Sequence, residues 1–365
     1  MLRDFISAWK YALPFHPGPF DTRYFLIVDH HRGVERVRIV VTGSLAYDYI
    51  MSFPGYFKDH LLMDRAHTLS VSFLVDSMKK MRGGVAGNIA YTLALLGERP
   101  LIVGTVGHDF DDYRQWMEAQ GIDTSGIIAI PTEFTASCFI NTDLANNQLV
   151  ALYAGAMAHA RDISIRHLGL GKDDLVVISP SDPEGMSRIA AECRELGVPF
   201  LYDPGKQMPR LQPSQILDYL QDAFILIAND YELAMMAQKT GKAEKELIEL
   251  PLLCVVTRGA QGSTFYSAHG RERVEIPIAE AENRDPTGAG DAYLAGVVFG
   301  ISRRFAIPVI GRIASLAAAY AIEQRGCQEH HYTPAEFSSR YVASFGPSPE
   351  MEAYARLKGE PTAPP

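Results

Sequence analysis

The chain has 365 residues, of which 47% are hydrophobic and 21% charged, a composition typical of a globular protein. This length allows one large α/β domain or two ordinary ones. The net charge of −9 argues against a nucleic-acid-binding surface, and no apolar run is long enough to span a bilayer, so neither partner is expected. The cysteines have no metal-ligand spacing and fit a reducing cytoplasm; they are Cys138, Cys193, Cys254 and Cys327.

Strands and helices are expected to alternate along most of the chain. Residues 1–36, aromatic and rich in proline, form an extension to which we assign no role. The expected elements, in chain order, are a strand at 37–42, a helix at 86–96, strands at 101–106, 137–142, 148–153 and 175–179, a helix at 184–196, a strand at 199–202, a helix at 214–221, a strand at 224–228, a helix at 230–239, strands at 253–257, 263–267 and 272–276, and helices at 288–302 and 308–323.

This alternation predicts an α/β fold with a doubly wound, mostly parallel sheet flanked by helices on both faces. Residues 47–53 and 67–75 alternate between apolar and polar residues outside this rhythm, and residues 143–147 have the composition of a hairpin turn. We therefore expect a small β lid with strands drawn from about 47–75 and 134–153. The domain is expected to cover residues 37–345, followed by a tail at 346–365.

The run Asp-Pro-Thr-Gly-Ala-Gly-Asp at residues 285–291 precedes a helix rich in small residues. Thr287 is expected to cap that helix, and the amides of Gly288, Ala289 and Gly290 are expected to point at an anion. Asp291 then lies in the first turn, where its carboxylate can accept a proton from a hydroxyl. The first four residues alone are also ordinary helix-start chemistry, and it is the full run that favours an anion site.

This run resembles the C-terminal signature of the ribokinase-like (PfkB) family of sugar and nucleoside kinases. Three further runs resemble family motifs and occur in the family's order. They are Gly-Gly-Val-Ala-Gly-Asn at 83–88, Asn-Asp-Tyr-Glu at 229–232 and Thr-Arg-Gly-Ala-Gln-Gly at 257–262. Four ordered motifs make a strong signal, and the resemblance spans roughly residues 37–345. Local runs such as 86–91 and 142–148 look most like bacterial adenosine kinases.

The resemblance implies a role for each motif. Asp48, Gly83, Gly84 and Asn88 would hold the hydroxyls of a sugar. Glu232 would order Mg²⁺-bound waters beside Asn229, although Asn229 and Glu232 also form a capping-box pattern. The remaining ATP-binding residues would be Thr257, Gly259, Gly262 and Thr287.

Two further sets of residues have less specific signals. The resemblance also implies that Asp285 helps to bind a monovalent cation such as K⁺ near the anion site, with carbonyls of the segment 325–328. Lys206, Arg258 and Arg284 are cations that can reach a phosphate, and solvated surface positions are their ordinary alternative.

The predicted reaction is transfer of the γ-phosphoryl group of ATP to a primary hydroxyl of a nucleoside, with adenosine converted to AMP. A ribose or fructose kinase and a non-catalytic nucleotide- or sugar-binding regulator remain open, as does the choice between monomer and homodimer. A dehydrogenase is disfavoured because no Gly-x-Gly-x-x-Gly follows the first strand. Four aromatic residues in or near the lid are either lid core or stacking partners for a base: Phe73, Phe134, Phe139 and Tyr153.

Overall fold

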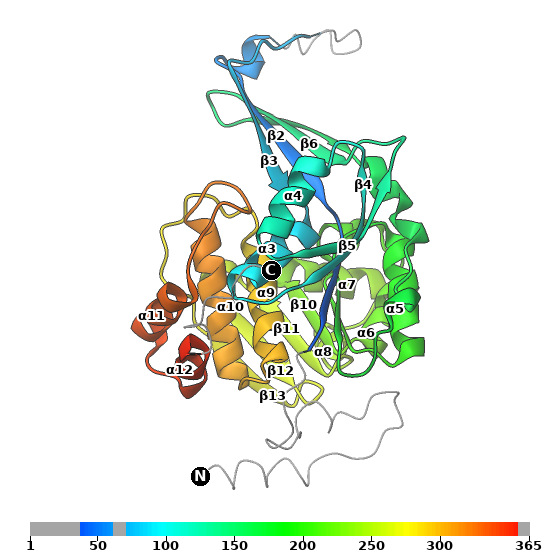
Figure 1. Cartoon of the computed structure of the whole chain (residues 1–365), viewed down its shortest axis with the longest axis vertical. Coiled ribbons are helices and arrows are strands. Elements are labelled where there is room, and N and C mark those ends of the chain that lie inside the picture. Colours follow the sequence, from blue (N-terminus) through cyan, green and yellow to red (C-terminus); the bar gives the residue numbers. More distant parts are fainter. Residues whose placement is uncertain (1–36, 61–70, 357–365) are drawn as a thin grey trace, which may run out of the picture. The chain divides into compact units, whose positions relative to one another are not determined.

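The computed structural model describes residues 37–60 and 71–356, and the expected extension at 1–36 lies outside this range. Within these residues the strands form a nine-stranded sheet and a separate four-stranded sheet. Figure 1 shows the helices flanking the larger sheet and the smaller sheet at its end. None of the described helices is both long and apolar enough to cross a bilayer.

The large sheet has the order β13-β12-β11-β10-β9-β8-β1-β4-β5. Its strands from β5 to β11 are parallel, and β12 and β13 add an antiparallel edge. The strands are β1 (Ile39–Thr42), β4 (Leu101–Gly107), β5 (Asp123–Ile130), β8 (Leu175–Ile178), β9 (Phe200–Tyr202), β10 (Ile225–Asn229), β11 (Leu253–Thr257), β12 (Ser263–Ser267) and β13 (Glu272–Ile276). The central strands β1 and β8 are buried along their whole length, as expected for apolar runs covered on both faces.

Helices cover both faces of this sheet, as the sequence predicted. One apolar cluster joins the sheet to α3, α9, α10, α11 and α12, and a second joins it to α5, α6, α7 and α8. The helices are α3 (Val85–Leu95), α4 (Asp111–Ala119), α5 (Pro183–Leu196), α6 (Pro213–Asp222), α7 (Asp230–Thr240), α8 (Glu244–Ile248), α9 (Ala289–Ser302), α10 (Ile307–Ile322), α11 (Pro334–Phe345) and α12 (Pro349–Arg356). Packing continues beyond residue 345, where the domain was expected to end, because α12 buries Met351 and Tyr354 in the first cluster.

The small residues of α9 allow it to pack closely against α10. A Cβ added at Gly296 would lie 2.4 Å from Cα of Ala314, and one at Gly300 would lie 2.7 Å from Cγ1 of Ile310. The small-residue pattern behind residues 285–291 therefore reflects helix packing. This packing fixes the amino end of α9 at the edge of the sheet.

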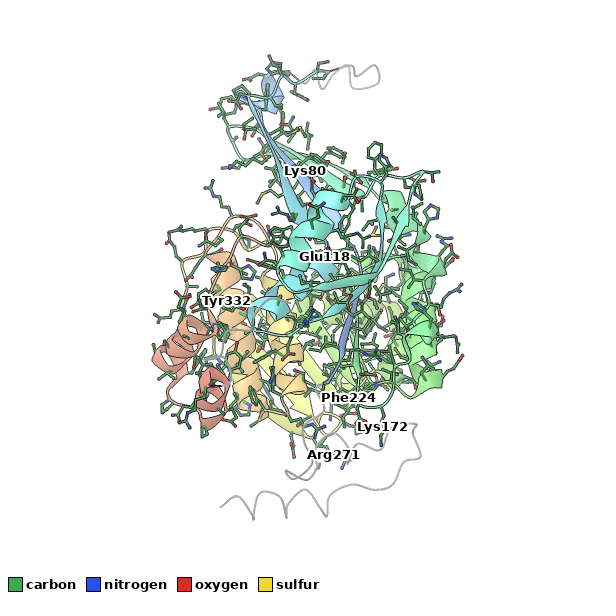
Figure 2. The ribbon with its side chains drawn as sticks, viewed as in Figure 1. Lys80, Glu118, Lys172, Phe224, Arg271 and Tyr332 are labelled. Atoms are coloured by element: carbon green, nitrogen blue, oxygen red, sulfur yellow. The ribbon has the colours of Figure 1, made fainter. Side chains whose placement is uncertain are left out.

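The lid is a mixed four-stranded sheet with the order β3-β2-β6-β7, in which β2 and β6 are parallel and the two outer pairs are antiparallel. Its strands are β2 (Ala46–Ser52), β3 (Ser77–Gly83), β6 (Ala136–Thr142) and β7 (Gln148–Tyr153). The prediction of a strand at 67–75 was wrong for residues 71–75, which are irregular, while residues 67–70 lie outside the described range. The lid strand in this part of the chain is β3, which begins at Ser77. Its polar sequence has no apolar alternation because most of its residues are exposed, and Lys80, labelled in Figure 2, lies 3.6 Å from the centre of the Tyr47 ring.

Candidate active site

The candidate site lies at the carboxyl ends of the parallel strands. Ser44 follows β1, Pro180 follows β8, Asp203 follows β9, and Asn229 and Thr257 end β10 and β11. The order in which strands are added to the sheet reverses at β1. β4 and β5 are added on one side of β1, and β8 and the later strands are added on its other side. Ligands of open α/β sheets bind at such a switch point. The backbone N–H of Ser44 donates to the carbonyl of Pro180 across it at 3.0 Å.

The amino end of α9 presents unused backbone donors at this edge. The N–H groups of Gly288, Gly290 and Asp291 have no hydrogen-bond partner among the described residues. Gly288 is the N-cap with φ of 80°, and a Cβ added at Gly290 would meet nothing within 4 Å. The open space and free donors suit an anion.

Two details of this turn differ from expectation. Thr287 was expected to cap α9, but its own N–H is bound by the side chain of Asp285 at 3.0 Å, and the helix begins after Gly288. The N–H of Ala289 donates to the carbonyl of Pro286 at 3.2 Å. The N–H of Ala289, which was predicted to face the anion, is therefore already used. The free N–H of Asp291 takes its place in the candidate anion site.

Asp291 lies beside the amino end of α9, with its carboxylate held by Asn88. Nδ2 of Asn88 donates to Oδ2 of Asp291 at 2.6 Å. Burial raises the pKa of Asp291 from 3.8 to about 6, opposed by the Asn88 hydrogen bond and by the charge of Lys206. Asp291 is thus ionised at neutral pH, with a pKa closer to that of a useful base than an exposed carboxylate has.

Asn88 is itself held by a buried chain of hydrogen bonds, which we call the amide relay (Tyr113, Gln328 and Asn88). Because a carboxylate only accepts, Asn88 must turn Nδ2 toward Asp291 and Oδ1 toward Gln328. Nε2 of Gln328 donates to that Oδ1 at 2.8 Å and also to the hydroxyl of Tyr113, which donates to the carbonyl of Gly83 at 3.1 Å. The direction of every bond is fixed, so the relay sets the orientation of the Asn88 amide.

Asp48 lies on β2 of the lid, next to Gly83 of β3. A Cβ added at Gly83 would lie 2.7 Å from Oδ2 of Asp48, so only glycine leaves room for the carboxylate there. Gly84 follows with φ of 90° where the chain crosses Ser44 and enters α3. Burial raises the pKa of Asp48, and the charge of Lys206 opposes this. The structure thus brings together Asp48, Gly83 and the relay that holds Asn88.

Asn229 and Glu232 form the capping box that their spacing indicated. The N–H of Asn229 donates to Oε2 of Glu232 at 2.9 Å, and Oδ1 of Asn229 accepts from the N–H of Glu232 at 2.8 Å. Oε1 of Glu232 has no hydrogen-bond partner among the described residues. Burial raises the pKa of Glu232. A structural cap and a carboxylate oxygen available to a ligand therefore coexist.

Comparisons with known proteins show the family of this chain. Residues 39–334 match the model of the pfkB family carbohydrate kinases. The chain belongs to the pfkB family. It is therefore a kinase, a phosphotransferase whose acceptor is a hydroxyl group.

Relatives and solved structures refine this assignment. The nucleoside kinase of Methanothermobacter thermautotrophicus is 30% identical over 316 residues, covering 86% of this chain and 98% of the relative. The ligand-free nucleoside kinase of Burkholderia thailandensis has a TM-score of 0.74 and 37% identity, covering 83% of this chain and 99% of that protein. The same enzyme in complex with inosine has a TM-score of 0.73 and 36% identity, covering 85% and 98%. The fold is ribokinase-like.

The remaining predicted residues of this pfkB family member fall into two groups. Thr257 and Gly259 lie at an open edge, since a Cβ added at Gly259 would meet nothing within 4 Å. Gly262 is required by packing instead, because a Cβ there would lie 2.2 Å from the carbonyl oxygen of Ile276. Asp285 ties two loops together, accepting from the N–H groups of Thr287 and Gly326 at 3.0 Å each.

Three residues of the site escaped the sequence analysis: Tyr113, Asp203 and Gln328. Asp203 directly follows the β9 strand in the turn Asp-Pro-Gly, a position that could have been recognised because active-site loops of α/β folds follow parallel strands. Burial raises the pKa of Asp203 well above its ordinary value, and the charges of Glu232 and Asp291 add to this. Tyr113 and Gln328 carry no sequence signal, since only tertiary packing brings them to Asn88.

The four aromatic residues considered as base-stacking partners contact other residues of the lid or its loops, while Phe134, Phe139 and Tyr153 remain 55%, 39% and 43% exposed. Phe139 stacks on Tyr49 with ring centres 4.9 Å apart, on the face of β2 opposite to Asp48. Phe134 packs on His108, and the Tyr153 hydroxyl donates to Glu133. Phe73 packs in a cluster with Phe53, Phe57 and His60.

The face of the lid that carries Asp48 is mostly apolar on β6 and β7, while β3 adds Met81 and Lys79 opposite Asp48 and Ile50. Strand pairing sets Asp48 opposite Cys138, which pairs with Leu152, and sets Ile50 opposite Ile140, which pairs with Val150. Directly paired residues share a face, so these side chains lie together. Leu152 is 80% exposed and Val150 53% exposed. We call Ile50, Ile140, Val150 and Leu152 the lid face.

Proposed function

We propose that this kinase transfers the γ-phosphoryl group of ATP to a primary hydroxyl of a nucleoside. One observation carries the proposal: the Asp291 carboxylate, with Asn88 bound to it at 2.6 Å, lies beside free N–H groups at the amino end of α9. A proton acceptor beside an anion site is what transfer to a hydroxyl requires. The relatives named nucleoside kinase support a nucleoside as the acceptor, and one neighbouring structure holds ADP and inosine.

Asp291 acts as the base in this mechanism. The acceptor oxygen attacks the γ-phosphorus in line, the bond from the γ-phosphorus to the bridging oxygen of ADP breaks, and the hydroxyl proton passes to Asp291. Because phosphoryl transition states are loose, proton transfer need not be early, and a carboxylate with a pKa of about 6 suffices. Activity should fall as the pH drops below about 6, where Asp291 becomes protonated.

The N–H groups of Gly288, Gly290 and Asp291 hold the oxygens of the transferring group in this proposal. Charge develops on these oxygens, and oriented backbone donors stabilise it without reorganising. Mg²⁺ would be held by Glu232, whose Oε1 is unbonded within the described residues, and by Asp203, whose pKa the charge of Glu232 raises further. When bound through water, the ion would neutralise phosphate charge.

The lid supplies the acceptor specificity. Asp48 accepts hydrogen bonds from the vicinal hydroxyls of a ribose, and the lid face offers an apolar surface to a flat base. A free sugar would leave this apolar surface exposed to water, which favours a nucleoside over ribose or fructose. Adenosine is the substrate that we propose first, and inosine is the alternative supported by the neighbouring complex.

Several finer expectations stay predictions. One is that Asp285 helps to bind a K⁺ ion, and a turnover rate that does not depend on K⁺ would contradict it. A cytoplasmic location and a monomeric or homodimeric state are others. Roles for Thr257, Gly259 and Thr287 in ATP binding are proposed from their place at the open edge beyond β11 and before α9.

An ADP-production assay tests the proposal. We expect ATP-dependent turnover with adenosine or inosine at kcat/KM at least 100-fold above that with ribose, fructose or fructose phosphate. Equal or greater turnover of a free sugar would replace the nucleoside assignment by the sugar-kinase alternative. ATP binding without turnover of any acceptor would favour a regulator.

A further inference from the structure

We propose that Lys206 is a catalytic residue whose ammonium group contacts the phosphoryl group as it passes from nucleotide to acceptor. This inference rests on the proposed function and adds a side chain that none of the predicted motifs contains.

Lys206 lies in the turn Gly205–Arg210, which comes after β9. It follows β9, which is separated by one strand from β11 of the nucleotide side and by one strand from β1 of the acceptor side. Adjacent strands are about 4.8 Å apart, so the end of β9 is about 10 Å from each of those strands. The turn that carries Lys206 therefore lies between the nucleotide side and the acceptor side of this sheet edge.

The loop that carries Lys206 is held rigidly. Gly205 has φ of 43°, and a Cβ added there would lie 2.5 Å from Cγ of Pro180, so the turn depends on glycine. The N–H of Gln207 donates to the carbonyl of Pro204 at 3.0 Å. The backbone of Lys206 is thus fixed, while its side chain remains exposed.

The Lys206 ammonium is also available. Of the three cations considered from the sequence, Arg258 donates to Thr264 and Tyr266, and Arg284 donates to Glu282. Lys206 makes no hydrogen bond or ion pair with the residues that the structure describes. Its three donors are free for a ligand.

The charges around Lys206 place it between the lid and α9. Its charge lowers the pKa of Asp48 on β2 and of Asp291 on α9 against the dominant effect of burial. It acts in the same direction on the thiols of Cys138 on β6 and Cys327, which follows α10. The charge of Lys206 therefore acts on four groups from four segments of the site.

A cation is needed at this point because the other charged groups around it are acids. Asp48, Asp291, Asp203 and Glu232 all approach the site, and Asp203 is affected by both Glu232 and Asp291. A transferring phosphoryl group adds further negative charge next to them. An ammonium between Asp48 and Asp291 offsets this charge where the new bond forms.

The test compares Lys206→Met and Lys206→Arg with Lys245→Met. Lys245 lies on α8 with its side chain 86% exposed, which makes Lys245→Met a matched control. We expect Lys206→Met to lower kcat about 100-fold, because removing one donor of charge stabilisation costs this order of magnitude. Lys206→Arg should recover part of the loss, and Lys245→Met should behave as the parent protein.

Two readouts separate contact with the phosphoryl group from a structural role. The acid limb of the kcat/KM profile should move to higher pH in Lys206→Met, since losing the positive charge raises the pKa of Asp291. The Kd of ADP should stay within about twofold, because ADP lacks the transferred group. A kcat within threefold of the parent, or an unmoved acid limb, would overturn the proposal for Lys206 and leave the role of Asp291 intact. If the proposed function itself were wrong, the Asp291→Asn variant would instead keep normal turnover.

Discussion

The two sheets of this molecule meet the active site in different ways. The central parallel strands of the large sheet are buried, and Asp203 follows the end of β9 while Glu232 lies in the first turn of α7, after β10. The lid strands are largely exposed, with every residue of β7 accessible to water. The buried sheet therefore positions the reacting groups, while the lid offers Asp48 and an aliphatic surface to the acceptor. Changes at the sheet edge should lower kcat, and changes on the lid should raise the KM of the acceptor.

The largest effect is expected at Asp291. Replacing Asp291 with asparagine removes the proton acceptor and should lower kcat by 10³-fold or more, with ATP affinity within a few-fold. Stopped-flow or steady-state ADP production measures the first quantity and calorimetry the second. Retained turnover would show that the sheet edge does not supply the base.

The same substitution should stabilise the fold above pH 6. Burial raises the folded-state pKa of Asp291 to about 6 from 3.8, so between these values the folded chain holds a proton that the unfolded chain releases. Stability then falls as the pH rises through this window, and Asp291→Asn should recover up to roughly 3 kcal/mol at pH 8 and nothing at pH 4. Thermal unfolding at both pH values checks this, and an equal shift at the two would contradict it.

The next largest effect on catalysis is expected at Asp48, which lies on the lid. Asp48→Asn removes a charged acceptor for two hydroxyl hydrogen bonds and should raise the KM of the nucleoside about 100-fold. The value of kcat should change much less than in Asp291→Asn. If kcat falls and KM does not, the lid takes part in the chemistry and the division between the two sheets fails.

The amide relay should give an intermediate loss of kcat. Tyr113→Phe removes the hydroxyl that joins Gln328 to Gly83, and Gln328→Leu removes the donor to Asn88. We expect kcat to fall about tenfold in each, because Asn88 then loses its fixed orientation toward Asp291. In the double variant the losses should be less than additive, since both residues act through one chain. Additive losses would mean that each acts separately, and normal melting temperatures in Tyr113→Phe would exclude general unfolding.

The smallest effect is expected on the lid face. Leu152→Ser should raise the KM of the nucleoside about fivefold by removing apolar contact with the base. Leu149→Ser is the matched control, because Leu149 lies on the same exposed strand with its side chain on the opposite face. Equal effects from the two substitutions would show that this face of the lid does not contact the base.

The sequence indicated the large sheet more accurately than the lid. Strands such as β8 and β11 are continuous apolar runs that water cannot reach, so their composition alone marks them. The lid strand β3 has no such pattern, and residues 71–75, which alternate, are irregular. The strand β5 and helix α4 were also missed, because β5 alternates weakly at an edge of the sheet and α4 is short.

The chain by itself determined the α/β alternation, the order of the four motifs and the glycine-rich start of α9, because each depends on local conformation or on residues close in sequence. Tertiary structure alone decided that Gln328 and Tyr113 hold Asn88 and that the aliphatic side of the lid carries Asp48. These contacts join segments up to 240 residues apart. They depend on strand order and on which face each strand turns inward, and no short stretch of sequence contains either.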